Sequence, residues 1–208
     1  ILYIVVPCYN EEAVIDETTK RLTEKLKNLI ITERISEKSR ILYVNDGSKD
    51  NTWTIIDRLY HENEFVTGLT LSRNRGHQNA LLAGLFEAKE HADMIISMDA
   101  DLQDDIDVID KFVDEYYNGS QIVYGVRKSR KTDTFFKRTT AIAFYKLMRM
   151  MGVELVYNHA DYRLMSKRAV EELEQYKEVN LFLRGLVPLI GFESSVVEYD
   201  RGKRYAGE

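Results

Sequence analysis

The sequence predicts an α/β protein in which a mostly parallel sheet is covered by helices on both faces. Short apolar runs and amphipathic stretches alternate through the first 125 residues, which is typical of a three-layer α/β fold. Polar loops follow each of the first four apolar runs, and in such sheets ligands bind beyond the carboxyl ends of the strands. The 208 residues are enough for one domain with its own core.

The elements follow from local patterns. Apolar, β-rich runs predict strands over residues 2–6, 41–44, 65–71, 94–98 and 121–124. Apolar residues at helical spacing predict the helices between them, over 12–31, 51–62, 79–91 and 106–117. After residue 127 the alternation breaks. The remainder is expected to be a helix-rich annex with one late strand near 195–199.

Composition excludes several classes of protein. The net charge of −5 argues against general nucleic-acid binding, and a single cysteine, Cys8, excludes an internal disulfide. No apolar run approaches the roughly 20 residues that span a bilayer. Because the chain begins inside a predicted strand and ends without a terminating signal, we expect it to be part of a longer protein. Its membrane segments would then lie outside this sequence.

The segment 127–149 is strongly basic. It holds eight Lys and Arg residues against one acid, a charge of +7, which leaves −12 for the rest of the chain. Apolar side chains are interleaved with the basic ones, which predicts a partly apolar, basic helix. Such helices bind anionic membrane surfaces, whereas the alternative is a solvated basic face.

One predicted strand ends in acids. Asp99 and Asp101 follow the apolar run 94–98, and Gln103 comes two residues later. Side chains two apart in extended chain point the same way, and paired carboxylates suit a Mg²⁺ or Mn²⁺ ion that also holds phosphates. The alternative is a solvated strand end in which the acids at 104–105 cap the next helix.

The polar loops carry motifs that resemble the family-2 glycosyltransferases of the GT-A fold. Three motifs in the order and spacing of that family are PCYNEE at 7–12, NDGSKD at 45–50 and DADLQ at 99–103. Stretches that resemble the branch glycosylating polyprenyl phosphates, such as bactoprenol glucosyltransferases and dolichyl-phosphate mannose synthases, lie at 72–84, 125–127, 160–165 and 182–186. The resemblance covers nearly the whole chain and implies a three-layer, Rossmann-like GT-A fold.

The resemblance also implies an activity. A single catalytic domain, 1–208, would consist of a nucleotide-sugar-binding half, 1–126, and an acceptor-side annex, 127–208, with transmembrane helices beyond it. It would transfer a hexose, with inversion, from a UDP- or GDP-sugar to an undecaprenyl- or dolichyl-type phosphate. The reaction would take place at the cytoplasmic face of the cell membrane, in the making of a cell-envelope glycan. A homo-oligomer is left open.

Three other functions are weighed. A relative in the same family could glycosylate a hydroxyl of a growing glycan instead of a lipid phosphate. A non-catalytic nucleotide-binding regulator would bind the nucleotide without turnover. A phospho-acceptor signalling domain is disfavoured by the length of the chain and by the Tyr-Asn-Glu-Glu loop at 9–12.

The resemblance assigns residues to the nucleotide-sugar pocket. These residues are Pro7, Tyr9, Glu11, Val44, Asp46, Asp99 and Ala100. Asp46 suits this role because a carboxylate can accept a hydrogen bond from a base N–H. Its alternative role is to cap the helix predicted over 51–62. His77 receives no role, since it could contact the nucleotide or simply cap a helix.

The resemblance further assigns catalytic, metal and acceptor residues. Asp99, Asp101 and Asp161 are implied to be catalytic, and Asp101 with Gln103 to bind Mg²⁺ or Mn²⁺. Arg127 and Arg138 would bind the acceptor phosphate, which a planar guanidinium can hold by two hydrogen bonds. The alternatives are that Arg127 is only surface charge and that Asp161 only pairs with Arg163.

Overall fold

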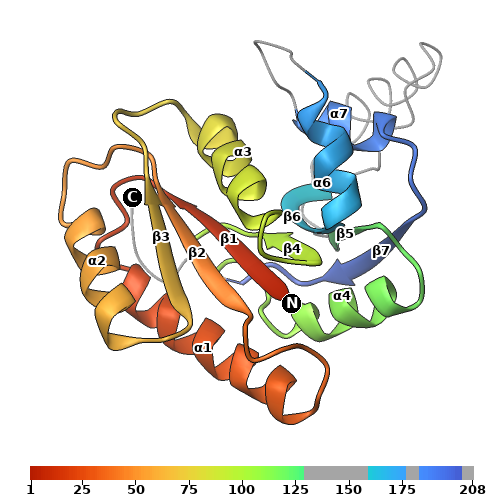
Figure 1. Cartoon of the computed structure of the whole chain (residues 1–208), viewed down its shortest axis with the longest axis horizontal. Helices are drawn as coiled ribbons and strands as arrows, with labels where there is room; N and C mark the ends of the chain where they lie inside the picture. The colour runs from red at the N-terminus through yellow and green to blue at the C-terminus, as the bar shows by residue number, and fades with distance from the viewer. Residues whose placement is uncertain (129–158, 177–182, 203–208) are drawn as a thin grey trace.

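The computed structural model describes residues 1–128, 159–176 and 183–202, and a seven-stranded sheet runs through it (Figure 1). The strands, in spatial order, are β3 (Val66–Thr70), β2 (Arg40–Asn45), β1 (Leu2–Cys8), β4 (Met94–Ser97), β6 (His159–Ser166), β5 (Ile122–Arg127) and β7 (Ser194–Tyr199). The first four are parallel, β6 is antiparallel to both its neighbours, and β7 is parallel to β5.

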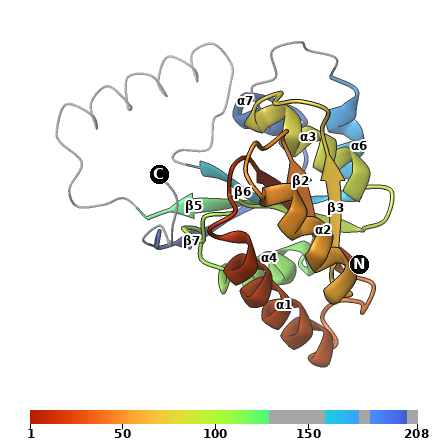
Figure 2. The same cartoon turned by 90° about the vertical axis from the view of Figure 1, so that its left-hand side faces the viewer.

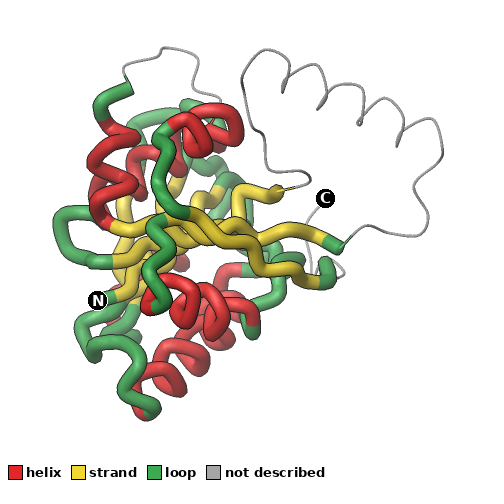
Figure 3. Tube along the Cα trace, turned by 90° about the vertical axis from the view of Figure 1, so that its right-hand side faces the viewer, coloured by secondary structure: helices red, strands yellow, loops and turns green. Residues whose placement is uncertain are grey.

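Helices cover both faces of this sheet (Figures 1 and 3). One face carries α1 (Ile15–Ile31), α2 (Thr52–Glu62) and α4 (Val108–Tyr117), and the other carries α3 (His77–Ala88), α6 (Lys167–Glu174) and α7 (Leu183–Leu189). Successive residues of β1 alternate between the two cores: Ile4 and Val6 pack on the side of α1, and Val5 on the side of α3. A strand covered on both faces is apolar throughout, which explains the unbroken apolar runs.

The four predicted helices begin one to three residues from the predicted starts, and the structure explains two of these differences. α1 starts at Ile15 instead of residue 12, because the backbone N–H of Glu11 donates to Thr52 Oγ1 (2.8 Å) and so belongs to the loop. α3 starts at His77 instead of Asn79, directly after Gly76, whose φ of +87° turns the chain. Both differences come from loops that pack against other loops.

The strand β6 is the element that sequence reasoning missed. It lies between β4 and β5, so the part of the chain after residue 127 contributes two strands to the sheet, β6 and β7, as well as helices. Its charged residues, Asp161 and Arg163, hide the apolar pattern expected of a central strand. Arg163 is nevertheless buried, and its Nη2 donates to Asp161 Oδ1 (2.8 Å), which makes its burial tolerable. The predicted fold class is confirmed by the sheet and its two helical layers.

Two predictions concern the membrane. Within residues 1–128, 159–176 and 183–202, no helix is both long and apolar enough to cross a bilayer. The basic segment 127–149 lies outside the described residues beyond Lys128, so the predicted basic helix stays a prediction.

Figure 2 shows β5, β6 and β7 together on the side of the sheet away from β2 and β3.

Candidate active site

A cavity of about 460 Å³ opens at the carboxyl ends of β1, β2 and β4. It brings together eight of the residues assigned from the resemblance: Pro7, Tyr9, Glu11, Asp46, Asp99, Ala100, Asp101 and Asp161. The parallel order of the strands explains this convergence, because their carboxyl ends share one edge of the sheet. Residues far apart in sequence therefore line one cavity.

The charge of this cavity is one-sided. Five carboxylates line it: Glu11, Asp46, Asp99, Asp101 and Asp161. Among its described lining residues none is Lys or Arg, and only His77 could become positive. An anionic ligand such as a diphosphate would be repelled here unless a cation came with it.

Asp46 builds the wall of the cavity. Its carboxylate accepts hydrogen bonds from the backbone N–H groups of Arg75 (2.6 Å) and Gly76 (2.9 Å), so it fixes the loop before α3. The predicted alternative, that Asp46 caps α2, is wrong. The N-cap residue of α2, Asn51, makes no side-chain capping hydrogen bond, and the N–H of the first helical residue, Thr52, donates to Asp50 Oδ1 (3.0 Å).

The two loops meet at Gly47. Its φ is +66°, and a Cβ there would lie 2.6 Å from the carbonyl carbon of Arg73 and from the backbone nitrogen of Asn74. No other residue type fits this approach without displacing backbone. Gly47 therefore allows the loop after β2 to touch the loop before α3.

His77, which received no role from the sequence, lies between two acids. Its Nε2 is 3.8 Å from both Asp99 Oδ1 and Asp161 Oδ2. Burial raises the pKa of Asp99, as does the nearby carboxylate of Asp104, while His77 partly opposes this. The helix start at residue 77 places the imidazole here, and no local pattern in the sequence could have shown it.

Asp161 is held by two arginines. Arg163 Nη2 donates to Oδ1 (2.8 Å), and Arg184 Nη2 donates to Oδ2 (3.1 Å). Burial alone would raise the pKa of Asp161, but the hydrogen bond from Arg184 and the charge of Arg163 lower it below its usual value. The predicted alternative pairing with Arg163 is thus present. Arg184 was missed because 23 residues separate it from Asp161.

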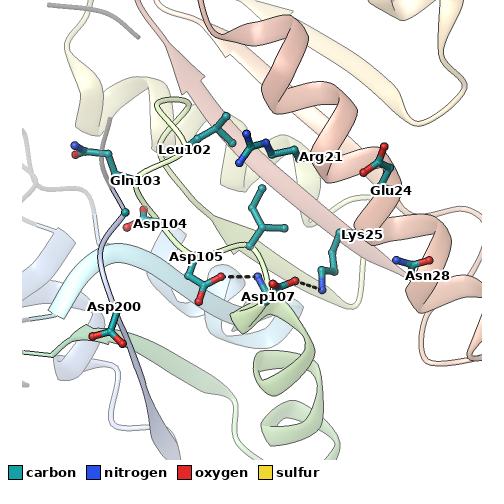
Figure 4. A pocket seen from close by; sticks show the side chains of 12 residues that line it. Arg21, Glu24, Lys25, Asn28, Leu102, Gln103, Asp104, Asp105, Asp107 and Asp200 are labelled. Carbon is teal, nitrogen blue, oxygen red and sulfur yellow. Dashed lines mark hydrogen bonds and ion pairs between the residues drawn. The ribbon is translucent and has the colours of Figure 1, made fainter. Parts of the chain in front are cut away.

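The aspartate loop, residues 99–105, separates the predicted metal ligands. Asp101 lines the cavity and its Oδ1 accepts the backbone N–H of Gln103 (3.0 Å). The side chain of Gln103 instead contacts Arg201 and lines a second cavity, on the side of α1 (Figure 4). The structure therefore brings Asp99 and Asp101 together and leaves Gln103 apart from them.

The carboxylates of this cavity suit a divalent cation that is also bound by the phosphates of a substrate. The described residues contain no group of three or more His, Cys, Asp or Glu side chains arranged to hold a metal. Mg²⁺ and Mn²⁺ do not need one, since they are commonly held by one or two carboxylates together with the phosphates of a substrate. Asp101, with Asp99 beside it, offers hard oxygen ligands of this kind.

The remaining assigned residues lie elsewhere. Val44 is fully buried against α3, close to Gly84, and is not among the described residues that line the cavity. Arg127 lies at the end of β5, where its Nη2 donates to Asp104 Oδ1 (3.3 Å). Arg127 therefore makes a specific ion pair with Asp104 and is not only surface charge. Arg138 falls outside the described residues.

The acids at 104–105 were predicted, in one alternative, to cap the next helix. Asp105 comes near that role, because its Oδ1 accepts the N–H of Asp107 (3.0 Å) just before α4. Asp104 does not share it. Its carboxylate turns to Arg127 and to the hydroxyl of Tyr199.

The sheet order and the two helical layers are those of the GT-A fold. Glucosyl-3-phosphoglycerate synthase from Mycobacterium tuberculosis, solved with Mn²⁺, uridine-diphosphate and phosphoglyceric acid, has this fold. It matches with a TM-score of 0.62 at 16% identity, covering 99% of this chain and 71% of that one. At this identity the likeness establishes the fold.

The chain belongs to the family Glycosyl transferase family 2, whose pattern it matches over residues 3–174. It is 60% identical over 208 residues to YkoT, an uncharacterized glycosyltransferase of Bacillus subtilis (strain 168), and 38% identical over 205 residues to the bactoprenol glucosyl transferase of Shigella phage SfV. These alignments cover 100% and 98% of this chain but 62% and 64% of the relatives, so the chain spans less than two thirds of their length. The resemblance seen in the motifs is confirmed.

Proposed function

We propose that the protein is a metal-dependent, inverting glycosyltransferase that moves a hexose from a nucleotide-diphosphate sugar to a polyprenyl phosphate. The observation that carries the donor is the cavity itself. Its five carboxylates, without a lining Lys or Arg among the described residues, suit a diphosphate that arrives with a divalent cation. The acceptor is supported by the relatives named bactoprenol glucosyl transferase.

The residues of the cavity have different roles in donor binding. Asp101 and Asp99 would hold Mg²⁺ or Mn²⁺, which supplies positive charge to the departing diphosphate when it is bound. Asp46 fixes the loop before α3 through the N–H groups of Arg75 and Gly76, and so shapes the opposite wall. Tyr9, 40% exposed at the mouth of the cavity, has a ring available for a nucleoside base.

The acceptor side needs no strong base. A phosphate monoester has its second pKa near 6, so it is largely ionised at neutral pH and can attack the anomeric carbon directly. One in-line displacement then inverts that carbon. Asp161, whose pKa is lowered, is a poor proton acceptor, and we assign it the task of orienting Arg163 and Arg184. Arg127 and Arg138 would bind the acceptor phosphate.

A transfer assay with the whole protein tests this proposal. Membranes that carry it would be given labelled nucleotide sugars and a polyprenyl phosphate, with Mn²⁺ or with EDTA. We expect a labelled lipid that forms only with the metal and releases its sugar in mild acid. Label in a glycan and not in lipid would favour the alternative hydroxyl acceptor. Metal-dependent nucleotide binding without any turnover would favour a regulator.

The location follows from the acceptor. A polyprenyl phosphate lies in the membrane and a nucleotide sugar in the cytoplasm, so we assign the reaction to the cytoplasmic membrane face. The basic segment 127–149 would contribute about 1 kcal/mol per engaged basic residue to binding an anionic surface. Sedimentation with neutral and anionic vesicles tests this, and equal binding to both would contradict it.

A further inference from the structure

Three elements meet at a buried acid beside the aspartate loop. The side chain of Asp104 is only 1% exposed, and it accepts hydrogen bonds on Oδ1 from the hydroxyl of Tyr199 (2.5 Å) and from Arg127 Nη2 (3.3 Å). Arg127 Nε donates in turn to the Tyr199 hydroxyl (3.1 Å). We call these three side chains the Asp104 junction.

The backbone fixes the geometry of this junction. Arg127 and Tyr199 are directly paired residues of the parallel strands β5 and β7. The ring of Tyr199 also packs edge-on against Tyr162, with ring centroids 5.4 Å apart. The hydroxyl of Tyr199 is therefore held in place by neighbours on two sides, and so is the arginine that donates to it.

The charge of Asp104 keeps Arg127 in place. Oδ2 of Asp104 is buried and has no hydrogen-bond partner within residues 1–128, 159–176 and 183–202. Its one ion pair there is with Arg127. If the guanidinium moved away, a buried carboxylate would lose its counter-charge, which is costly. The ion pair with Asp104 therefore favours the present position of Arg127.

We propose that Asp104 and Tyr199 are positioning residues, which hold Arg127 at a fixed distance from the metal-binding end of the aspartate loop. Asp101 and Asp104 are three residues apart in that loop. The junction therefore connects Arg127, on the acceptor side, to the proposed metal ligand through a short stretch of backbone. This inference rests on the proposed function, in which Arg127 contacts the acceptor phosphate. The link sets how the lipid phosphate is presented to the sugar.

Removing one hydroxyl tests the link. Tyr199→Phe keeps the ring and its packing on Tyr162, but deletes the two hydrogen bonds that the hydroxyl makes and leaves the one between Arg127 and Asp104. Tyr162→Phe is the matched control, because Tyr162 is equally buried and its hydroxyl donates to the backbone carbonyl of Asp105 (2.9 Å), not to Arg127. Asp104→Asn keeps the size of the side chain and removes its charge.

The KM for a short-chain polyprenyl phosphate would be measured on the whole protein, together with kcat, the affinity for UDP with Mn²⁺ and the melting temperature. We expect Tyr199→Phe to raise this KM about tenfold, with kcat and UDP affinity nearly unchanged, and Asp104→Asn to raise the KM at least as much. Tyr162→Phe should lower the melting temperature without changing the KM.

The outcomes separate the link from the reaction. An unchanged acceptor KM in folded Tyr199→Phe and Asp104→Asn proteins would overturn the positioning role and leave the proposed function intact. An equal rise of KM in Tyr162→Phe would also overturn it, since general loosening would then explain the effect. If the unmodified protein transfers no sugar to polyprenyl phosphate, the proposed function fails, and the positioning role with it.

Discussion

Two cavities of similar volume, about 460 and 410 Å³, lie on opposite sides of the aspartate loop and are both rich in acids. The first opens at the ends of the parallel strands. The second lies between the loop and α1 and contains Asp104, Asp105 and Asp107 (Figure 4). Equal acidity therefore does not distinguish them.

The two cavities differ in the positively charged side chains that line them. Arg21 and Lys25 line the second cavity, and Lys25 Nζ lies 2.8 Å from Asp107 Oδ1 and 2.6 Å from Asp110 Oδ2. The described lining of the first cavity offers only His77. In the second cavity the chain supplies its own counter-charges, with Lys25 paired to Asp107 and Arg127 paired to Asp104. In the first, most of the neutralising charge has to arrive with a ligand.

The largest effect should follow from removing the charge of Asp101. Asp101→Ala should lower the affinity for UDP with Mn²⁺, and the rate of transfer, by about a thousandfold, because the metal contributes several kcal/mol of charge stabilisation. Asp101→Asn should do nearly the same while keeping an oxygen for the N–H of Gln103. Calorimetry with and without EDTA measures this.

The matched control is Asp107→Ala, on the other side of the loop, which loses the contact with Lys25. Its metal-dependent UDP affinity should stay within about twofold of the unmodified protein, because Asp107 is not among the described residues that line the first cavity. An equal loss in both variants would show that the two cavities do not differ as described.

The wall of the first cavity should be intolerant of a single methyl group. Gly47→Ala is expected to lower the free energy of unfolding by about 2–4 kcal/mol, since it adds left-handed backbone strain to a clash with backbone atoms. Gly119→Ala is the control. Its φ is also positive, +110°, but the new Cβ would meet nothing within 4 Å. Urea unfolding would show whether the crowding at Gly47 adds to the cost of the dihedral angle.

Asp161 is the acid of the first cavity that does have its own cations. Its lowered pKa keeps Asp161 ionised from pH 6 to pH 8, a range over which the acceptor phosphate, whose second pKa is near 6, loses a proton and the neighbouring His77 can also titrate. Asp161→Asn should slow transfer about tenfold or more at pH 6, where a partly protonated phosphate depends more on well-oriented arginines, and less at pH 8.

The comparison of rates at the two pH values decides the role of Asp161. A loss of many thousandfold that is the same at both would instead make it an obligatory base. Asp105→Asn, an exposed acid outside the first cavity, should leave the pH profile unchanged.

The smallest effect is expected in the second cavity. Lys25→Met removes the contacts with Asp107 and Asp110 and should cost about 1 kcal/mol of stability, less at high salt. The UDP affinity should not change. Lys20→Met, at an exposed position of the same helix, serves as the control. A large loss of UDP affinity in Lys25→Met would mean that the second cavity also takes part in donor binding.

The sequence by itself determined the parallel part of the sheet and most of the first cavity. Periodicity is local, so the runs that became β1, β2, β3 and β4 could be recognised one at a time. Parallel strands then bring their carboxyl ends to one edge whatever the details of packing. That is why the sequence alone could place Tyr9, Asp46 and Asp99 in one cavity.

Only the tertiary structure decided which charges meet. Arg163 is buried in a central strand because Asp161 and β4 lie beside it, and its charge conceals β6 from any reading of apolar pattern. Asp104 finds its partners 23 and 95 residues away, at Arg127 and Tyr199. Such pairings depend on distance and burial in the folded chain, and neither quantity is a property of a local stretch of sequence.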